Sequence, residues 1–294
     1  MPAAVVDPAI FECVPNVSEG RDIAIVDACA RAIEAAGVTL ANRTSDAFHH
    51  RSVFTFFGSR EEVRAAALAL AAVTTERIDM RAHRGAHPRS GALDVLPIVP
   101  FGSATMADAV ALTREVALEI WITLRVPSVF YAEAATTERR RLLGDVRAGQ
   151  FEGLVERRRR DGPPDAGDIA AHPTAGCIAA GARPPLVAFN IVLASGNLAL
   201  AREIARTIRE RGGGLRTLRA LGIALGDDRV QVSCNLTDHR ATPLHRVVGM
   251  VRELAARSNV TIERTELIGL VPRAALAALA AHALGIEVLR LPTQ

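Results

Sequence analysis

The chain has 294 residues, 49% of them hydrophobic and 23% charged, which is ordinary for a folded protein of one large or two modest domains. No apolar run approaches the roughly 20 residues that a bilayer-spanning helix requires, and no basic segment precedes an apolar one at the N-terminus, so we expect neither a membrane span nor a signal peptide. The four cysteines lack CxxC spacing, which predicts neither a zinc site nor a disulfide framework and indicates a reducing cytoplasm.

Arginine supplies all 35 residues of the Lys+Arg total, so lysine Schiff-base chemistry and a P-loop lysine are excluded. The net charge of +3 favours anionic ligands weakly, and the planar guanidinium group binds carboxylates through two hydrogen bonds. The arginine run at 157–160 has no interleaved aromatic residues, so it predicts a solvated helix face rather than a nucleic-acid surface. Contact with an acidic substrate tail is the alternative.

The first half of the chain alternates strand and helix patterns. Apolar residues with helical spacing precede Gly37, which is a plausible helix stop. Ser59 lies three residues before Glu62, a capping-box pattern that predicts the start of a second helix. Pro97 predicts that its strand lies at a sheet edge or ends early. The elements expected here are strands at 11–15, 38–41, 52–57, 93–99 and 128–132, and helices at 23–36, after Ser59 and at 106–124.

The segment at 161–185 is dense in Gly, Pro and Ala and shows neither the helix nor the strand period. We therefore place the domain boundary within it, which gives an N-terminal subdomain of residues 1–178 and a C-terminal subdomain of residues 179–294. Beyond it the alternation resumes. The elements expected there are strands at 186–193, 217–225, 229–236, 260–264 and 286–289, and helices at 198–211, 243–257 and 273–284.

Both halves follow a β-α-β-β-α-β order, although they show no obvious internal repeat in sequence. This order predicts an α/β protein, an α+β sandwich with two mixed sheets that each carry helices on one outer face. A doubly wound sheet is disfavoured because no GxGxxG motif follows the first strand.

The stretch HRGAHPRSGALD at 83–94 is the strongest candidate for a functional loop. Pro88 disfavours helical geometry at His87, and the flanking glycines free the backbone, so His87 is displayed on an extended loop. A histidine with a pKa near ~6.5 is a natural proton carrier at neutral pH. Arg84 and Arg89 are expected to disfavour its charged form. On spacing alone, a catalytic and a structural role are equally open.

A metal site is the competing interpretation, since His83 and His87 lie four residues apart and His49 and His50 could join them. The glycine and proline residues disrupt the helical face that such a pair needs, and no carboxylate or thiolate lies in register. A nucleophilic cysteine is a weaker possibility, for which Cys177 is the one candidate in a loop.

Several motifs together resemble the glutamate formiminotransferase family. The match covers nearly the whole chain, and the string HxGxHPRxGALDV is highly specific. No cyclodeaminase-like region follows, so the resemblance is to the stand-alone bacterial form. The matching stretches are ECVPNVSEGRD at 12–22, HHRSVFTFFG at 49–58, RIDMRAHRGAHPRSGALDVLPIVP at 77–100, HPTAGCIAAGARPPLVAFNIVL at 172–193, QVSCNLTDHRATPLH at 231–245 and ELIGLVP at 266–272.

The resemblance implies transfer of a formimino group between N-formimino-L-glutamate and tetrahydrofolate, a step of histidine degradation. Tetrahydrofolate would be a co-substrate, and no metal would be needed. The resemblance also implies two α/β subdomains whose sheets face each other across a substrate tunnel. The expected assembly is a homodimer that binds small molecules and neither nucleic acid nor membranes.

The resemblance assigns His87 as the catalytic general acid/base, which would move a proton between the nitrogens of a tetrahedral intermediate. Arg51 and Arg89 are the candidates for clamps on the carboxylates of glutamate and of the folate tail. The family's folate-binding loop falls on Gly167, Asp168, Ile169, Ala170, Ala171, His172, Pro173, Thr174, Ala175 and Gly176.

The chain departs from the family pattern at two places. Mammalian members have aromatic residues in the folate loop where this chain has Ala171 and Ala175, so pterin packing is expected to differ. They also have a carboxylate where Thr44 stands, so either the nearby Asp46 orients the catalytic histidine or the acceptor has changed. Transfer to another amino acid or of a formyl group therefore stays open, as do a metal-dependent amidohydrolase and a folate-binding protein without turnover.

Overall fold

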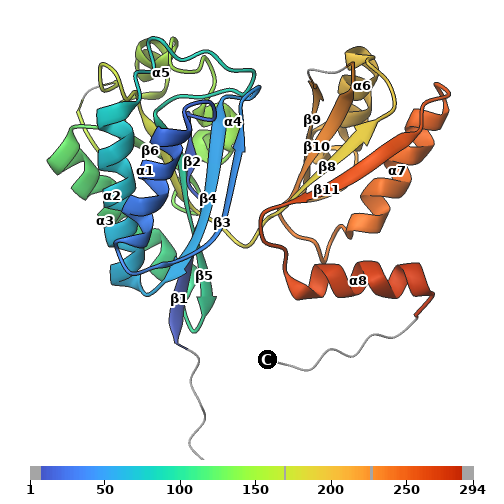
Figure 1. Ribbon diagram of the computed structural model, residues 1–294, viewed down its shortest axis with the longest axis horizontal. Coiled ribbons are helices and arrows are strands. Elements are labelled where there is room, and N and C mark those ends of the chain that lie inside the picture. The colour runs from blue at the N-terminus through green and yellow to red at the C-terminus, as the bar shows by residue number, and fades with distance from the viewer. Residues whose placement is uncertain (1–7, 169, 226–227, 287–294) are drawn as a thin grey trace, which may run out of the picture. The chain divides into compact units, whose positions relative to one another are not determined.

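The computed structural model describes residues 8–168, 170–225 and 228–286 (Figure 1). The chain divides into two units, and the division falls between Arg183 and Pro184. The boundary predicted at 178/179 falls inside the first unit, at the start of strand β7 (Ile178–Ala182). Within the described ranges, no helix is both long and apolar enough to cross a membrane.

Over its described residues, the first unit contains one sheet of seven strands. The order is β3-β4-β1/β2-β5-β7-β6, where β1 and β2 both lie between β4 and β5. The pairings from β3 to β5 are antiparallel, whereas β7 runs parallel to β5 and β6. The bounds are β1 Ala9–Cys13, β2 Asn16–Val17, β3 Thr39–Asp46, β4 Arg51–Gly58, β5 Leu93–Gly102, β6 Ser128–Ala132 and β7 Ile178–Ala182.

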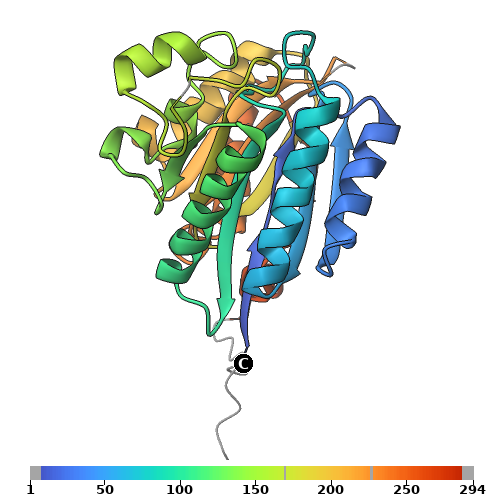
Figure 2. The ribbon, with the colours of Figure 1, turned by 90° about the vertical axis from the view of Figure 1, so that its left-hand side faces the viewer.

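Helices α1, α2 and α3 lie side by side across one face of this sheet (Figure 2). They bury alternate strand residues, such as Phe54 and Phe56 of β4, in the main apolar core. The predicted capping box forms, since the Ser59 hydroxyl accepts from the Glu62 amide and the Glu62 carboxylate accepts from the Ser59 amide. The bounds are α1 Ile23–Glu34, α2 Arg60–Arg77 and α3 Met106–Leu124.

The opposite face is covered at its β6–β7 end by α4 (Leu143–Val146) and α5 (Leu154–Asp161), which form a second, smaller apolar cluster with the strands. The expectation of helices on a single face is therefore wrong at this end of the sheet. Nearer β3, β4 and β5, the same face carries polar side chains. Arg51 is an example, because it alternates with the core residues of β4.

Strand β5 is central although it contains Pro97, which corrects the prediction of an edge strand. It pairs with β1 and β2 on one side and with β7 on the other. The Pro97 carbonyl accepts from the Val14 amide at 3.2 Å, in the break between β1 and β2 where Pro15 interrupts the partner strand. The missing N–H of Pro97 faces the same break, so no ladder hydrogen bond is lost.

The sequence pattern does not predict β7, because IAAGA lacks both alternation and β-branched residues beyond the first. The strand lies between two parallel neighbours and all five of its residues are buried. Small residues are required there, since a Cβ on Gly181 would lie 2.5 Å from the Tyr131 ring.

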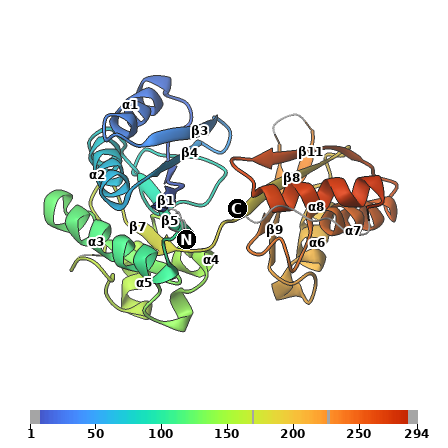
Figure 3. The ribbon, with the colours of Figure 1, turned by 90° about the horizontal axis from the view of Figure 1, so that it is seen from below.

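The second unit has the order β9-β10-β8-β11, which repeats β3-β4-β1-β5 of the first unit in an antiparallel sheet. This is the split β-α-β arrangement of ferredoxin-like domains, as the predicted β-α-β-β-α-β order implies. Helices α6 and α7 pack on one face, and α8 packs against α7 (Figure 3). The bounds are β8 Val187–Leu193, α6 Leu198–Ile208, β9 Leu218–Ala224, β10 Val230–Leu236, α7 Leu244–Ala256, β11 Ile262–Ile268 and α8 Arg273–Leu284.

The bounds of α3, α8 and β6 are those predicted, and most of the other predicted elements differ by a few residues at their ends. Short 3-10 helices at Glu138–Arg140 and Glu210–Gly212, together with α4, were not predicted by periodicity. The strand predicted at 286–289 lies almost entirely outside the described residues.

Candidate active site

Two loops of the first unit lie against each other on the polar side of the sheet. One is the turn at 47–50 between β3 and β4, and the other is the connection at 78–92 between α2 and β5. The His83 Nε2 donates to the His50 carbonyl at 3.0 Å, which ties the two loops together. The contact gathers the histidines singled out in the sequence, His49, His50, His83 and His87.

Gly85 is the point of closest approach between these loops. A Cβ at this position would lie 2.5 Å from the His49 carbonyl oxygen, so only glycine fits. Next to it, the Ala86 amide donates to the Phe48 carbonyl at 3.4 Å. The backbone itself therefore fixes the spacing between the two loops.

His87 is half-buried and its tautomer follows from one contact. Its Nδ1 lies 2.7 Å from the Pro88 carbonyl, which can only accept, so Nδ1 carries the proton and Nε2 keeps its lone pair. Burial and the guanidinium groups of Arg51 and Arg147 lower the pKa of His87 to about 3. The ring is therefore a neutral base at physiological pH, although the arginines responsible differ from the flanking pair that was predicted.

Arg51 and Arg147 share one buried carboxylate. The Asp94 Oδ2 accepts from Arg51 Nη1 at 2.7 Å and from Arg147 Nη1 at 3.0 Å. Burial alone would raise the pKa of Asp94, but the two cations lower it to about 2. Two cations beside one carboxylate leave one net positive charge next to His87, which favours an anionic ligand.

The donors of the two arginines are only partly used. Arg51 donates from Nε to the Asn16 side chain at 3.0 Å, and Arg147 Nε is buried without a partner among the described residues. Arg51 therefore remains a candidate carboxylate clamp, and the structure adds Arg147 beside it.

Asp46 contacts His49. Its carboxylate accepts from the His49 amide at 2.7 Å and lies 2.9 Å from His49 Nδ1. No hydrogen bond joins Asp46 to His87 within the described ranges, so the prediction that Asp46 orients His87 directly is not supported. The His49 ring instead lies between them, with its centroid 6.3 Å from that of His87.

The remaining two histidines hold the loops in place. Glu19, which accepts from three backbone amides that follow it, lies 3.0 Å from His50 Nε2. The His50 Nδ1 lies 3.0 Å from the Arg84 carbonyl, so each ring nitrogen faces an oxygen of the neighbouring backbone or side chain. The His50 ring stacks on His83 at 4.1 Å. Burial lowers the pKa of His83 to about 4, which keeps that ring neutral.

Arg89 is fully engaged within the protein. Its Nε donates to His83 Nδ1 at 3.2 Å, and its Nη atoms donate to the His83 carbonyl, to Gln150 and, through two bonds, to Glu152. These contacts use all five N–H donors. No donor is left for a substrate carboxylate, so Arg89 is a positioning residue and the prediction of a clamp at this residue is corrected.

The predicted folate-binding loop lies beside the connection at 78–92. The Met80 amide donates to the Thr174 carbonyl at 2.8 Å, and the Ala92 amide donates to the Ala175 carbonyl at 2.9 Å. Gly176 has φ +75°, and a Cβ there would lie 2.2 Å from the Ser90 carbonyl oxygen. The loop is therefore anchored next to the segment that carries His87.

Within the loop, His172 closes a turn on itself. Its Nδ1 accepts from the Ala175 amide at 3.0 Å, and burial lowers its pKa. Ala175 is buried while Ala171 is partly exposed, so an aromatic ring at 175 would not fit this core. Gly167, Asp168, Ala170 and Pro173 are the other described residues of this loop, and Ile169 lies outside the described residues.

The side chains that the metal and cysteine interpretations invoke have other contacts in the structure. A metal needs a free imidazole lone pair, yet His83 accepts from Arg89 at Nδ1 and donates to the His50 carbonyl from Nε2. No group of three or more His, Cys, Asp or Glu side chains is placed to hold a metal in the part of the chain that the structure describes. Cys177 is buried rather than exposed, and burial raises its pKa to about 11, so it is an unreactive thiol.

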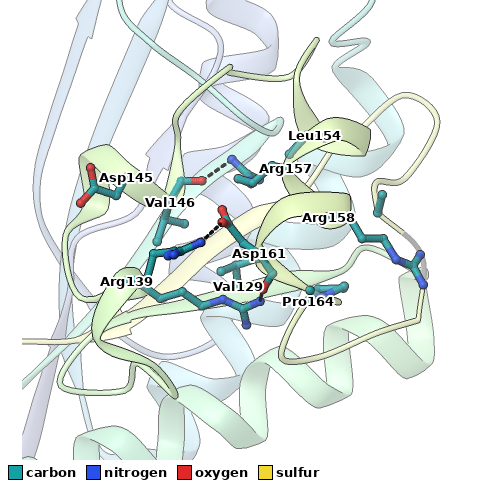
Figure 4. Close-up of a pocket in the computed structure, with 12 residues that line it drawn as sticks. Val129, Arg139, Asp145, Val146, Leu154, Arg157, Arg158, Asp161 and Pro164 are labelled. Atoms are coloured by element: carbon teal, nitrogen blue, oxygen red, sulfur yellow. Dashed lines mark hydrogen bonds and ion pairs between the residues drawn. The ribbon is translucent and has the colours of Figure 1, made fainter.

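A small pocket between β6 and α5 is lined by arginines but does not contain the histidine cluster (Figure 4). Arg157 donates to the Val146 carbonyl, and Arg139 pairs with Asp161. These contacts anchor α5, so the pocket is structural. As predicted, the arginine run at 157–160 forms an exposed helix face, except that Arg157 is buried.

Sequence reasoning missed several groups that surround His87. Asp94 and Glu19 lay inside the matching motifs, where a buried acid beside several arginines could have been suspected. Arg147 lies in a stretch without periodicity, and no local pattern points to it. His49 was considered only as a possible metal ligand.

Fold and site together define an α/β protein of two split β-α-β units, whose first unit carries a neutral imidazole beside excess buried positive charge. An enzyme that acts on anionic substrates could use such an arrangement. The chain belongs to the formiminotransferase family. Residues 10–183 match the formiminotransferase domain, N-terminal subdomain, and residues 188–289 match the formiminotransferase domain.

Curated relatives agree with this placement. The chain is 42% identical to the glutamate formimidoyltransferase of Streptococcus pyogenes serotype M1, over 95% of this chain and 94% of that protein. It is 39% identical to the glutamate formimidoyltransferase of Thermoplasma acidophilum, over 91% of this chain and 90% of that protein. The chain spans about half of the formimidoyltransferase-cyclodeaminase of Gallus gallus, with 38% identity over 91% of this chain and 51% of that protein.

Proposed function

We propose that this protein is a glutamate formimidoyltransferase, which moves the formimino group between N-formimino-L-glutamate and tetrahydrofolate in histidine degradation. The observation that carries the proposal is the neutral His87, with Nδ1 bound to Pro88 and Nε2 available, beside the Arg51–Asp94–Arg147 cluster. Relatives that match almost end to end and bear this name support it.

The chemistry needs a proton carrier more than any other group. Attack of a tetrahydrofolate nitrogen on the amidine carbon gives a tetrahedral centre, and the attacking nitrogen must lose a proton before glutamate can leave. A neutral imidazole within hydrogen-bond reach supplies this, which is worth roughly 10²–10⁴ in rate. The pKa of His87, lowered by burial and two guanidinium groups, keeps Nε2 able to accept.

Both substrates carry carboxylates, which the cluster of arginines can bind. Arg51 and Arg147 bring one more positive charge than Asp94 neutralises, and Arg147 Nε has no partner among the described residues. We assign the folate to the loop at 167–176, which is anchored beside the His87 segment. In this proposal tetrahydrofolate is a co-substrate, the two sheets line a substrate tunnel, and the protein is a cytoplasmic homodimer.

The amine acceptor is the least constrained part of the proposal. Thr44 stands where mammalian members have a carboxylate, but Asp46 follows it on the same face of β3, because side chains two residues apart on a strand point the same way. Asp46 can thus supply the acid from a neighbouring position. Because Thr44 replaces that carboxylate, two alternatives stay open: transfer to another amino acid, and transfer of a formyl group.

The test is turnover of N-formimino-L-glutamate with tetrahydrofolate, followed by pterin absorbance, for the wild type and His87→Gln. We expect His87→Gln to lose at least about 100-fold in kcat while it still binds tetrahydrofolate. His282→Gln, which removes an exposed histidine on α8, is the matched control and should keep wild-type activity. Near-normal turnover by His87→Gln would refute the assignment, and an inactive wild type would refute the proposed function.

A further inference from the structure

The histidine pair His49–His87 carries an inference that rests on the proposed function and deepens it. We infer that His49, held by Asp46, is a second catalytic group that protonates the departing glutamate nitrogen, while His87 accepts the proton of the attacking folate nitrogen. The site would then contain two imidazoles with opposite roles rather than one that shuttles a single proton.

The rings of His49 and His87 lie close together, and each has one ring nitrogen engaged within the protein. The ring centroids of His49 and His87 are 6.3 Å apart with planes inclined at 69°. Each Nδ1 is engaged, by Asp46 at 2.9 Å in one ring and by the Pro88 carbonyl at 2.7 Å in the other. Neither Nε2 has a hydrogen-bond partner among the described residues, so both are available to a substrate.

The charges around the two rings differ in sign. Burial would raise the pKa of Asp46, but hydrogen bonds from the His49 amide and ring lower it, so Asp46 is a carboxylate. The Asp46 carboxylate lies 2.9 Å from the His49 ring, whereas burial and the guanidinium groups of Arg51 and Arg147 lower the pKa of His87. Two titratable groups with opposed environments are the usual basis for separate acid and base roles.

The two rings are also fixed relative to each other. They stand on the turn at 47–50 and the connection at 78–92, which meet at Gly85 without room for a Cβ. The Ala86–Phe48 hydrogen bond and the bond from His83 to the His50 carbonyl hold the same contact. Such rigid placement of both groups is what concerted proton transfer requires.

The proposed step balances. The folate nitrogen forms a bond to the carbon of the amidinium substrate, the C=N π pair moves onto the imino nitrogen, and His87 Nε2 removes the proton of the now positively charged folate nitrogen. The His49 imidazolium gives its Nε2 proton to the glutamate nitrogen, and the C–N bond to glutamate breaks with its electron pair going to that nitrogen. The lone pair of the imino nitrogen re-forms the C=N bond of the formimino group on folate, and glutamate leaves as a neutral amine. One proton passing from His87 to His49 restores both rings, and the reverse reaction uses them with exchanged roles.

The experiment measures kcat against pH for His49→Ala, for His49→Gln as a second variant that keeps an amide donor, and for Asp46→Asn. The charged groups near His49 are Asp46 on β3, the Glu19–His50 pair and Arg51 on β4, and all remain in both His49 variants. Because a general acid must be protonated before it reacts, kcat of the wild type should fall towards alkaline pH. His282→Gln serves again as the control.

We expect both His49 variants to lose about 100-fold in kcat with little change in either KM, to lose the alkaline fall, and His49→Ala to regain activity with added imidazole. Asp46→Asn should reduce kcat alone but add nothing to His49→Ala. Unchanged kcat in the His49 variants would overturn the inference. A loss without imidazole rescue, or with the alkaline fall intact, would reduce His49 to a positioning residue and also overturn it. An inactive wild type would instead refute the proposed function, on which this inference depends.

Discussion

The two units share a strand order but differ in what their connections carry. In the first unit the hairpin turn at 47–50 and the helix-to-strand connection at 78–92 hold the histidine cluster. The counterparts in the second unit are the turn at 225–229 and the short connection at 257–261, which bring no comparable cluster together in the residues described. The two units thus share a topology, and the site residues of the first unit come from the side chains of its hairpin turn and from its longer helix-to-strand connection.

The largest expected difference in the free energy of unfolding is between acidic residues on the last strand of each split β-α-β motif. Asp94 on β5 is buried between two guanidinium groups, whereas Glu266 on β11 forms an exposed pair with Arg264 at 2.8 Å. Asp94→Asn leaves two buried cations uncompensated, so we expect a loss of about 3–5 kcal/mol in the free energy of unfolding. Glu266→Gln should cost about 1 kcal/mol or less. Urea unfolding of both variants measures the difference, and equal losses would contradict the account.

Glycines provide the next contrast. Gly85→Ala places a Cβ 2.5 Å from the His49 carbonyl oxygen and forces the two loops apart, so kcat should fall by about 100-fold while the fold is kept. Gly249→Ala, in helix α7 with open space around it, should stabilise the protein by about 0.5–1 kcal/mol and leave kcat unchanged. Steady-state kinetics with thermal unfolding separates the two, and a fully active Gly85→Ala would show that the loop spacing is unimportant.

Substitutions of two arginines near His87 should have different effects on KM and on stability. Arg147→Gln removes an incompletely paired donor, so the KM for N-formimino-L-glutamate should rise about 10-fold or more. Arg89→Gln removes a guanidinium group that is saturated by His83, Gln150 and Glu152, so it should lower stability by about 2 kcal/mol with a smaller change in KM. Steady-state kinetics and urea unfolding of both variants check this. A larger rise in KM for Arg89→Gln than for Arg147→Gln would mean that Arg89 binds the substrate carboxylate after all.

The last contrast concerns the pH dependence of stability. The pKa of His83 is lowered from 6.5 to about 4 by burial, so between these values the unfolded chain binds a proton that the folded chain does not. Stability from this residue is therefore lost as pH falls below about 6.5, by about 2 kcal/mol at pH 5 relative to pH 7. His83→Gln should flatten this dependence in urea titrations. An unchanged slope would mean that His83 is not held neutral.

The sequence predicts regular elements well where a local signal fixes them. The capping box at Ser59 and the helical spacing of α3 and α8 are local, and the structure confirms them. Strand β7 escapes prediction because its small residues suit a buried parallel position that only the neighbouring strands define. Pro97 led to the wrong prediction of an edge strand for a similar reason. A central strand can contain this proline only because the partner strand is interrupted opposite it.

The residues of the candidate site were likewise predictable only where a local sequence signal marks them. His87 could be singled out because Pro88 and the flanking glycines mark a displayed loop. Arg89 was misjudged because closeness in sequence says nothing about which donors are already occupied. Arg147 could not be found, since only the fold brings it to Asp94. The role of Asp46 changed for a similar reason, because the ring that it contacts belongs to His49.

The most direct test of the account is the protonation state of His87, measured by ¹⁵N NMR of imidazole-labelled protein between pH 5 and pH 8, with His87→Gln used for assignment. A pKa lowered to about 3 predicts a neutral ring throughout, with the proton on Nδ1 and the lone pair on Nε2. A titration near its ordinary ~6.5, or a proton on Nε2 in the neutral form, would contradict the proposal that His87 is held as a base.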